Sequence, residues 1–177
     1  MTERSMVVLV GADGEPVGVA GKLAAHTAPG RLHRAFSVVL YRPDGAVLLQ
    51  QRAAGKYHFP GAWANACCSH PLPGEALVAS AERRVAEELG LTTALSPVGR
   101  FTYRAQCPRS GLVEHEDDHV LLGVVGGDPR PEPSEVAAWH WADPTAVLAG
   151  RDLPGPLAPW LLPVLSLAEA ARARRVR

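Results

Sequence analysis

Two adjacent cysteines followed closely by a histidine are the residues whose types and spacing first suggest chemistry. Cys67 and Cys68 lie in the stretch ANACCSHP, and His70 follows Cys68 by two positions. A cysteine at the start of a loop that enters a helix, beside a metal-bound histidine, would have a lowered pKa and useful acidity. A buried apolar cysteine is the common alternative, and it fits one of the two thiols well.

A Glu-x-Glu pair in the stretch VEHEDDHV suggests a cation site. If a strand begins at residue 113, its side-chain period of two places Glu114 and Glu116 on one face, with His115 and Asp117 on the other. Two carboxylates this close repel each other unless a cation or a shared proton relieves them. Three histidines could add donors, although spacing alone does not bring them together: His26, His33 and His70.

The stretch SHPLPGEALVASAERRVAEELGL, residues 69–91, resembles the Nudix box. That box is a Gly-x5-Glu-x7-Arg-Glu-apolar-x-Glu-Glu-x-Gly-apolar pattern, which forms a loop, a helix and a second loop. The matching residues are Glu75, Arg83, Val85, Glu87, Glu88, Gly90 and Leu91. Two positions depart from the pattern, because Ser69 replaces the leading glycine and Arg84 replaces the glutamate after the arginine.

The arginine at position 84 changes what this helix can bind. In a hydrolase of this fold, the helix carboxylates hold divalent ions that activate water and clamp a pyrophosphate. Arg84 removes one carboxylate and supplies a phosphate donor, and it lies one turn before Glu88, on nearly the same face. Glu88 could therefore hold Mg²⁺ while Arg84 meets phosphate oxygens. A solvent-exposed Arg–Glu pair is the alternative.

Short apolar runs joined by turns must position these residues. Asp13-Gly14 joins the runs at residues 7–10 and 17–20, and Asp44-Gly45 joins those at 36–41 and 46–50, so each predicts a hairpin. Further strands are expected at residues 98–103, 113–125 and 137–141, and a surface loop at 126–134.

Two helices are expected among these strands. Residues 75–89 carry an apolar stripe, and Gly90 follows at the usual C-terminal stop. A second helix is expected at about residues 156–173, with an arginine-rich end that is read as solvated. We predict a single α/β (α+β) domain over residues 1–177, a Nudix fold whose mixed β-sheet packs between helices, with an N-terminal hairpin at about 7–20.

Composition narrows the range of partners. Eighteen basic and eighteen acidic side chains cancel, so phosphate recognition must be local, and nucleic acid or a membrane surface is not expected as a partner. No run approaches the roughly 20 apolar residues of a membrane helix, and no signal-peptide pattern is present. Three cysteines, two of them adjacent, disfavour a disulfide framework. We expect a cytoplasmic monomer or small homo-oligomer.

Several motifs in order resemble the type I isopentenyl-diphosphate isomerases, Nudix-fold relatives that isomerise rather than hydrolyse. The motifs are AHT at 25–27, RLHRAFS at 31–37, FPGAWANACCSHP at 59–71, FTYRA at 101–105, EHE at 114–116 and APW at 158–160. The resemblance extends from about residue 7 to residue 165. The motifs together are specific evidence for this family, whereas any one motif alone would be weak evidence.

The resemblance implies a role for each matching residue. The family's catalytic cysteine stands two positions before a metal-binding histidine, which selects Cys68, and the catalytic glutamate falls on Glu116. The family's metal site, which Mn²⁺, Zn²⁺ or Mg²⁺ could fill, corresponds to His26, His33, His70, Glu114 and Glu116. Glu88 corresponds to the glutamate that binds Mg²⁺ with the substrate diphosphate. Basic residues at diphosphate-contacting positions are Lys22, Arg52, Lys56 and Arg84, and the pocket aromatics are Tyr103 and Trp160.

The implied reaction converts isopentenyl diphosphate into dimethylallyl diphosphate through a tertiary carbocation, with Cys68 and Glu116 on opposite faces of the hydrocarbon. Its substrate is a small prenyl diphosphate. Two alternatives are a Nudix hydrolase of another diphosphate and a non-catalytic metal- or diphosphate-binding module. Two departures bear on the site: Ser69 replaces a family glycine, which costs about 1 kcal/mol if φ is positive there, and Asp117 stands beside Glu116.

Overall fold

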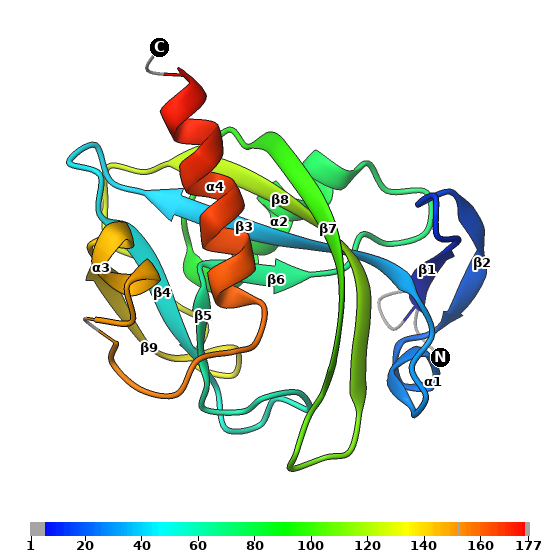
Figure 1. Ribbon diagram of the computed structural model, residues 1–177. Coiled ribbons are helices and arrows are strands. Elements are labelled where there is room, and N and C mark those ends of the chain that lie inside the picture. Colours follow the sequence, from blue (N-terminus) through cyan, green and yellow to red (C-terminus); the bar gives the residue numbers. More distant parts are fainter. Residues whose placement is uncertain (1–5, 152, 176–177) are drawn as a thin grey trace.

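A mixed β-sheet organises the chain, and the structure, a computed structural model, describes residues 6–151 and 153–175 (Figure 1). The strands are β1 (Met6–Val10), β2 (Pro16–Gly21), β3 (His33–Tyr41), β4 (Val47–Arg52), β5 (Trp63–Asn65), β6 (Cys67–Ser69), β7 (Ser96–Gln106), β8 (Val113–Val124) and β9 (Val136–Ala142). The helices are α1 (Lys22–His26), α2 (Leu77–Leu89), α3 (Pro144–Leu148) and α4 (Leu161–Arg175).

Strand β3 lies at the centre of the sheet. Its sequence HRAFSVVLY is almost wholly buried, as expected of a strand covered on both faces. Along one edge it pairs in parallel with β8, from His33 opposite Glu116 to Tyr41 opposite Val124. Along the other edge it meets β1, β6 and β4 in turn. Strand β3 therefore brings together β1, β4, β6 and β8, which lie far apart in the sequence.

The two faces of the sheet carry separate apolar cores. Helix α2 covers one face with Ala81, Val85 and Leu89, which pack in a cluster that includes Phe36 and Val38 of β3. Helix α4 covers the opposite face, and Figure 1 shows it in front of the sheet with α2 behind. The predicted arrangement, a mixed sheet packed between helices, is therefore confirmed.

Helix α2 begins two residues later than its apolar spacing predicts. Ala76 is extended and forms the N-cap, so the helix starts at Leu77. Glu75 lies in the preceding turn, where it accepts a hydrogen bond from the backbone N–H of Leu72. The predicted end is correct, because Gly90 adopts the left-handed conformation, with φ 63°, that favours glycine after a helix.

The C-terminal helix was predicted to begin at about residue 156, which is wrong. The backbone at Pro156 and Ala158 exchanges hydrogen bonds with Trp63 of β5, at 2.8 Å each, and this pairing keeps the segment extended. The helix starts only at Leu161 and continues to Arg175, beyond the predicted end at about 173. Arg172 in its last turns lies over the ring of Tyr41 at 4.0 Å.

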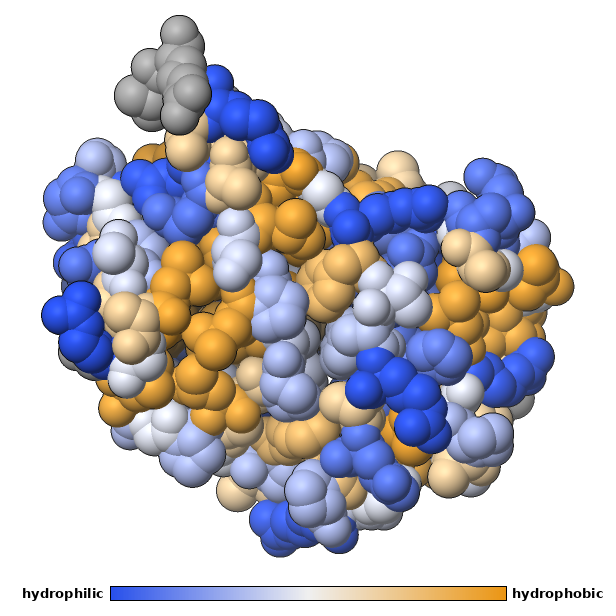
Figure 2. Space-filling model, in the orientation of Figure 1, coloured by the Kyte–Doolittle hydropathy of each residue, from blue (hydrophilic) through white to orange (hydrophobic). Residues whose placement is uncertain are grey.

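The two predicted hairpins differ in the structure. Strands β1 and β2 pair along their lengths, which confirms the first, and Figure 2 shows apolar side chains gathered over this hairpin at the right-hand edge. Strands β3 and β4 pair only at Tyr41 and Val47, because β6 takes the next positions on that edge of β3.

Strands β5 and β6 and helices α1 and α3 were not predicted. No helix of the described residues is long and apolar enough to cross a membrane.

Candidate active site

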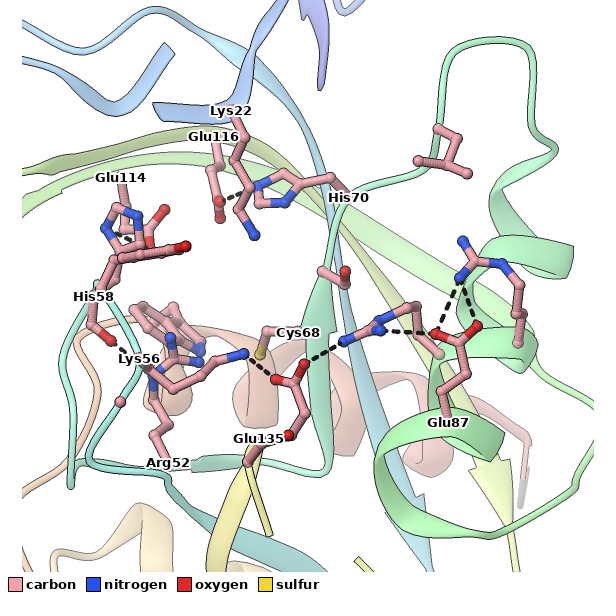
Figure 3. A pocket seen from close by; sticks show the side chains of 18 of the residues that line it. Lys22, Arg52, Lys56, His58, Cys68, His70, Glu87, Glu114, Glu116 and Glu135 are labelled. Carbon is pink, nitrogen blue, oxygen red and sulfur yellow. Dashed lines mark hydrogen bonds and ion pairs between the residues drawn. The ribbon is translucent and has the colours of Figure 1, made fainter. Parts of the chain in front are cut away.

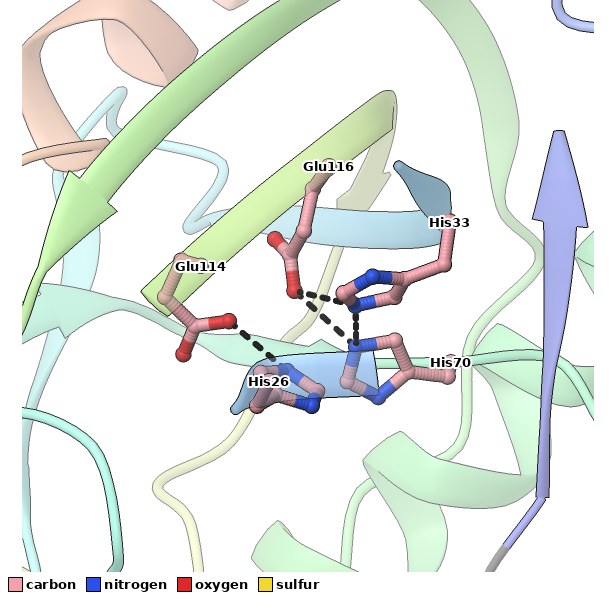
Figure 4. Close-up of side chains that lie close together, drawn as sticks. All are labelled: His26, His33, His70, Glu114 and Glu116. Carbon is pink, nitrogen blue, oxygen red and sulfur yellow. Dashed lines mark hydrogen bonds and ion pairs between the residues drawn. The ribbon is translucent and has the colours of Figure 1, made fainter. Parts of the chain in front are cut away.

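Five side chains from four parts of the fold converge in a buried cluster. His26 ends α1, His33 begins β3, His70 follows β6, and Glu114 and Glu116 lie on β8; one potential ligand atom of each lies within 4.8 Å of all the others. Figure 4 shows the five side chains pointing toward one another. The structure therefore brings together the whole set that the sequence suggested as a metal site.

The hydrogen bonds of the histidines fit a cation at this position. Nδ1 of His26 lies 2.6 Å from the carbonyl oxygen of Lys22, and Nδ1 of His33 lies 2.7 Å from that of Arg31. A carbonyl oxygen only accepts, so each Nδ1 carries a proton and each ring turns its Nε2 toward the cluster, where that nitrogen could bind a cation. There, Nε2 of His33 lies 3.1 Å from Nε2 of His70. Imidazole nitrogens and carboxylates that face one another in this way suggest a divalent metal site.

Strand register places a tyrosine beside the same cluster. Tyr103 on β7 is paired with Glu116 on β8, which is paired in turn with His33 on β3. The Tyr103 hydroxyl donates a 2.6 Å hydrogen bond to Glu116 Oε2. Burial raises the pKa of Glu116, but the hydrogen bond with His33 and the charge of that ring outweigh it, so the pKa is lowered and the carboxylate is ionised. Burial raises the pKa of Tyr103, which keeps its proton.

The two adjacent cysteines point to opposite faces of the sheet. Cys67 is fully buried in the core beneath α2. Cys68 packs against the core beneath α4 and lines a pocket together with His70. This is the alternation expected of extended backbone. The prediction of a loop entering a helix is wrong for these residues, since they form β6.

The lowered Cys68 pKa was predicted for a thiol beside a metal-bound histidine and stays a prediction, while the protein surroundings of the thiol act in the opposite direction. Burial raises the pKa of this thiol to about 12, and the nearby carboxylate of Asp118 raises it further, so the sulfur keeps its proton. The neighbours of the sulfur come from three strands. It donates to Asn65 Oδ1 at 3.2 Å and lies 3.6 Å from Ser37 Oγ, which itself donates to Asp118 at 2.8 Å. Sequence reasoning missed these three polar residues.

The pocket beside Cys68 has a volume of about 420 Å³. Its lining includes Tyr103, Glu116 and Trp160, and Figure 3 shows Cys68, Glu116 and His70 around it. Trp160 is buried, its ring lies 6.0 Å from that of Tyr103, and the Arg52 guanidinium lies 5.3 Å from the Trp160 ring centre. Residues predicted as acid, base and aromatic wall thus share one cavity.

The four predicted phosphate-binding cations line the same pocket: Lys22, Arg52, Lys56 and Arg84. The pKa of Lys22 is lowered because burial disfavours its charge and Lys56 repels it. Arg52 donates from Nε to the carbonyl oxygen of His58 at 3.0 Å, and Arg84 forms ion pairs with Glu87, Glu88 and Glu135.

Comparison with known proteins identifies the family. The model of the NUDIX domain matches residues 31–166. An isopentenyl-diphosphate Delta-isomerase of Nocardia farcinica is 51% identical over 93% of this chain and 95% of its own length. Another, from Streptomyces griseus, is 48% identical over 96% and 86%. The chain belongs to the Nudix isopentenyl-diphosphate Delta-isomerases. A crystal structure from Deinococcus radiodurans, 19% identical with a TM-score of 0.73, covers 91% of this chain and 97% of that one and has the same fold.

For a member of this isomerase family, the chain places one predicted residue unexpectedly. Glu88 lies on the buried face of α2, where its side chain is only 3% exposed and forms an ion pair with Arg84. The pocket lining carries its neighbour Glu87 instead. Glu88 and Arg84 do project from nearly the same helical face, as their spacing predicts. A Mg²⁺ role for Glu88 stays a prediction.

The two departures from the isomerase pattern prove mild. Phe59 is the one non-glycine residue with positive φ among residues 6–151 and 153–175, so Ser69 causes no left-handed strain. Asp117 points away from Glu116, toward Arg100 at 3.3 Å.

His58, which sequence reasoning did not select, lines the pocket with Nδ1 3.3 Å from Glu114. His58 lies in the loop at residues 53–62 between β4 and β5, where no strand or helix periodicity marks it in the sequence.

Proposed function

We propose that the protein interconverts isopentenyl diphosphate and dimethylallyl diphosphate, with Cys68 and Glu116 as the proton-transfer pair. The observation that carries this proposal is the shared pocket. A protonated thiol, an ionised carboxylate with its tyrosine and a buried indole meet four cationic side chains there. A hydrolase of this fold needs water and carboxylates that bind metal ions. Here, Arg84 forms ion pairs with Glu87 and Glu88, two carboxylates of the same helix.

The protonation states suit a reaction that adds one proton and removes another. Isomerisation requires addition of a proton to the terminal CH₂ carbon of the alkene. It also requires loss of a proton from the CH₂ carbon that adjoins the double bond on the side of the diphosphate. Cys68 holds a proton and Glu116 does not, so the pair has one proton to give and one site to receive. Because the reaction is reversible, each residue is the acid in one direction and the base in the other.

The aromatic wall serves the cationic stage of the reaction. Protonation of the alkene leaves a tertiary carbocation, which water would capture. Trp160 and Tyr103 close part of the pocket with apolar rings. The Trp160 ring face would also attract the cation, by about 2 kcal/mol when water is excluded.

The cations anchor the diphosphate and thereby orient the apolar tail. Lys22 and Lys56 repel each other across the pocket, and an anion between them would relieve that repulsion. Holding the charged end fixes where the alkene carbons lie relative to Cys68 and Glu116. With Mg²⁺ bound beside Glu88, part of the diphosphate charge would be neutralised at this end.

The histidine–glutamate cluster would hold a separate divalent ion, for which Zn²⁺, Mn²⁺ and Mg²⁺ all suit the mixed nitrogen and oxygen donors. Bound there, the ion would tune the proton affinity of Glu116.

We place the isomerase activity in the cytoplasm, where thiols stay reduced, because all three cysteines are free.

The test is an assay of purified protein with Mg²⁺ and isopentenyl diphosphate, in which NMR follows the isomer composition. Dimethylallyl diphosphate should accumulate to a constant ratio, with no matching release of phosphate or pyrophosphate. Hydrolysis at a rate equal to or above isomer formation would overturn the assignment.

A further inference from the structure

Glu135 lies at the pocket between two of the cations that are proposed to bind diphosphate. It precedes β9, and its backbone is held in place, since its carbonyl accepts from Ala53 N–H at 3.0 Å and its N–H donates to the carbonyl of Glu132 at 2.9 Å. Its side chain lines the pocket. The position of this carboxylate is therefore determined by the scaffold on both sides.

Each oxygen of the Glu135 carboxylate has its own cation. Oε2 is paired with Lys56, as Figure 3 shows, and Oε1 lies 3.2 Å from Arg84 Nη2. One anionic centre with two oxygens thus joins the two cations, as a phosphoryl group would. The charge is present, because the hydrogen bond and the charge of Lys56 outweigh burial and lower the pKa of Glu135.

The three side chains are partly open to solvent and so can exchange partners. Glu135 is 25% exposed, Lys56 23% and Arg84 20%. Ion pairs at such exposure are weak, and an anion with more charge can replace them. A diphosphate carries more charge and more acceptor oxygens than one carboxylate.

We propose that Glu135 is a placeholder for the substrate diphosphate: it forms ion pairs with Lys56 and Arg84 and must release both when the substrate binds. This inference rests on the proposed function, in which those two cations contact diphosphate. Glu135 thereby opposes anion binding and limits the affinity of the pocket for substrate, product and inorganic anions.

The experiment measures the dissociation constant of inorganic pyrophosphate with saturating Mg²⁺ by titration calorimetry. Glu135→Gln keeps the shape of the side chain but removes its charge, so it should bind pyrophosphate about three- to tenfold more tightly than the natural protein. The matched control is Glu132→Gln, an exposed glutamate of the same loop whose carboxylate bonds Ser134, and its affinity should be unchanged.

A double variant separates release of a cation from a general effect of charge. If Glu135 acts by occupying Lys56, its replacement should tighten binding less in a Lys56→Gln background than in the natural protein. Unchanged or weaker binding in Glu135→Gln would overturn the placeholder role, and so would tightening that persists in full without Lys56. Isomerase activity of the natural protein, assayed in parallel, tests the proposed function independently of this result.

Discussion

The acid–base part of the pocket and its cationic part are built in different ways. Tyr103, Glu116 and His33 stand opposite one another on three paired strands, and Cys68 is paired with Ser37 on the same sheet. Lys56 and Arg84 come instead from a loop and a helix, and ion pairs with Glu135 hold their ends. Backbone register positions the first group, whereas charge holds the ends of Lys56 and Arg84; of the other cations, Arg52 lies on strand β4.

This difference matches what each part has to do. Proton transfer requires donor and acceptor atoms within hydrogen-bond distance of particular carbons, so a small displacement is costly. Attraction of a diphosphate varies slowly with distance and tolerates movable side chains. In the proposed mechanism, paired strands therefore position the proton-transfer groups, whereas Lys56 and Arg84 would bind the diphosphate with long, partly exposed side chains.

The largest effect is expected from removing the thiol of the acid–base part. Cys68→Ala should lower turnover by about 10³-fold while fold and metal content are preserved, because a proton-transfer group typically contributes 10²–10⁴-fold. Its matched control is the adjacent Cys67→Ala, which should stay active and lose about 1 kcal/mol of stability from the core beneath α2. NMR rates and urea unfolding measure both. An inactive Cys67→Ala beside an active Cys68→Ala would reverse the assignment.

A somewhat smaller effect is expected at the metal cluster. His33→Ala or His70→Ala should reduce the metal that copurifies, by more than the roughly 10- to 100-fold loss of affinity typical when a partner of a ligand is removed, since each variant lacks a direct donor of a buried set. His115→Ala is the control, because this histidine is on β8 between the two glutamates but bonds the carbonyl of Gly30 on the other face. Elemental analysis decides. Full metal content in both ligand variants would show that these histidines are not ligands.

The cationic part should respond more mildly and without loss of that metal. Glu88→Gln is expected to weaken Mg²⁺-dependent pyrophosphate binding by about tenfold, as a single carboxylate ligand is lost. Glu87→Gln tests its neighbour, which lines the pocket where Glu88 does not. Calorimetry with and without Mg²⁺ compares the two. A larger effect from Glu87 would transfer the magnesium role to it, and loss of the tightly bound metal in Glu88→Gln would mean that the two metal sites are one.

Local patterns predicted which side chains of the proposed acid–base part share a face, whereas the roles of these residues came from the resemblance to the isomerase family. The period of two along β8 correctly separated Glu116 from Asp117, and the same alternation along β6 separated Cys68 from Cys67. The spacing of apolar residues predicted α2, and the Asp13-Gly14 turn predicted the β1–β2 hairpin. In each case the deciding interactions lie within a few residues of sequence.

Features that depend on distant contacts escaped prediction. The start of α4 is delayed by pairing with Trp63, about a hundred residues earlier in the chain. The raised pKa of Cys68 comes from burial and from Asp118 on another strand. Glu135 meets Arg84 across 51 positions, and no periodicity connects them. Pairings of this kind follow from tertiary packing, which a single sequence does not display.

The smallest effect concerns the turn that leads from β6 into α2 and so orients the helix of the cationic part. Hydrogen bonds from Arg83 lower the pKa of Glu75 to about 2, below its ordinary value of 4.5. The pair therefore stabilises the fold above pH 4.5, and this contribution is lost as the pH falls from 4.5 toward 2. Glu75→Gln should be less stable by about 1 kcal/mol near neutral pH, with a difference that shrinks in acid. Urea unfolding across this pH range measures it, and Arg83→Gln should weaken the same pH dependence. A difference between Glu75→Gln and the natural protein that stays constant into acid would show that the ion pair does not anchor this turn.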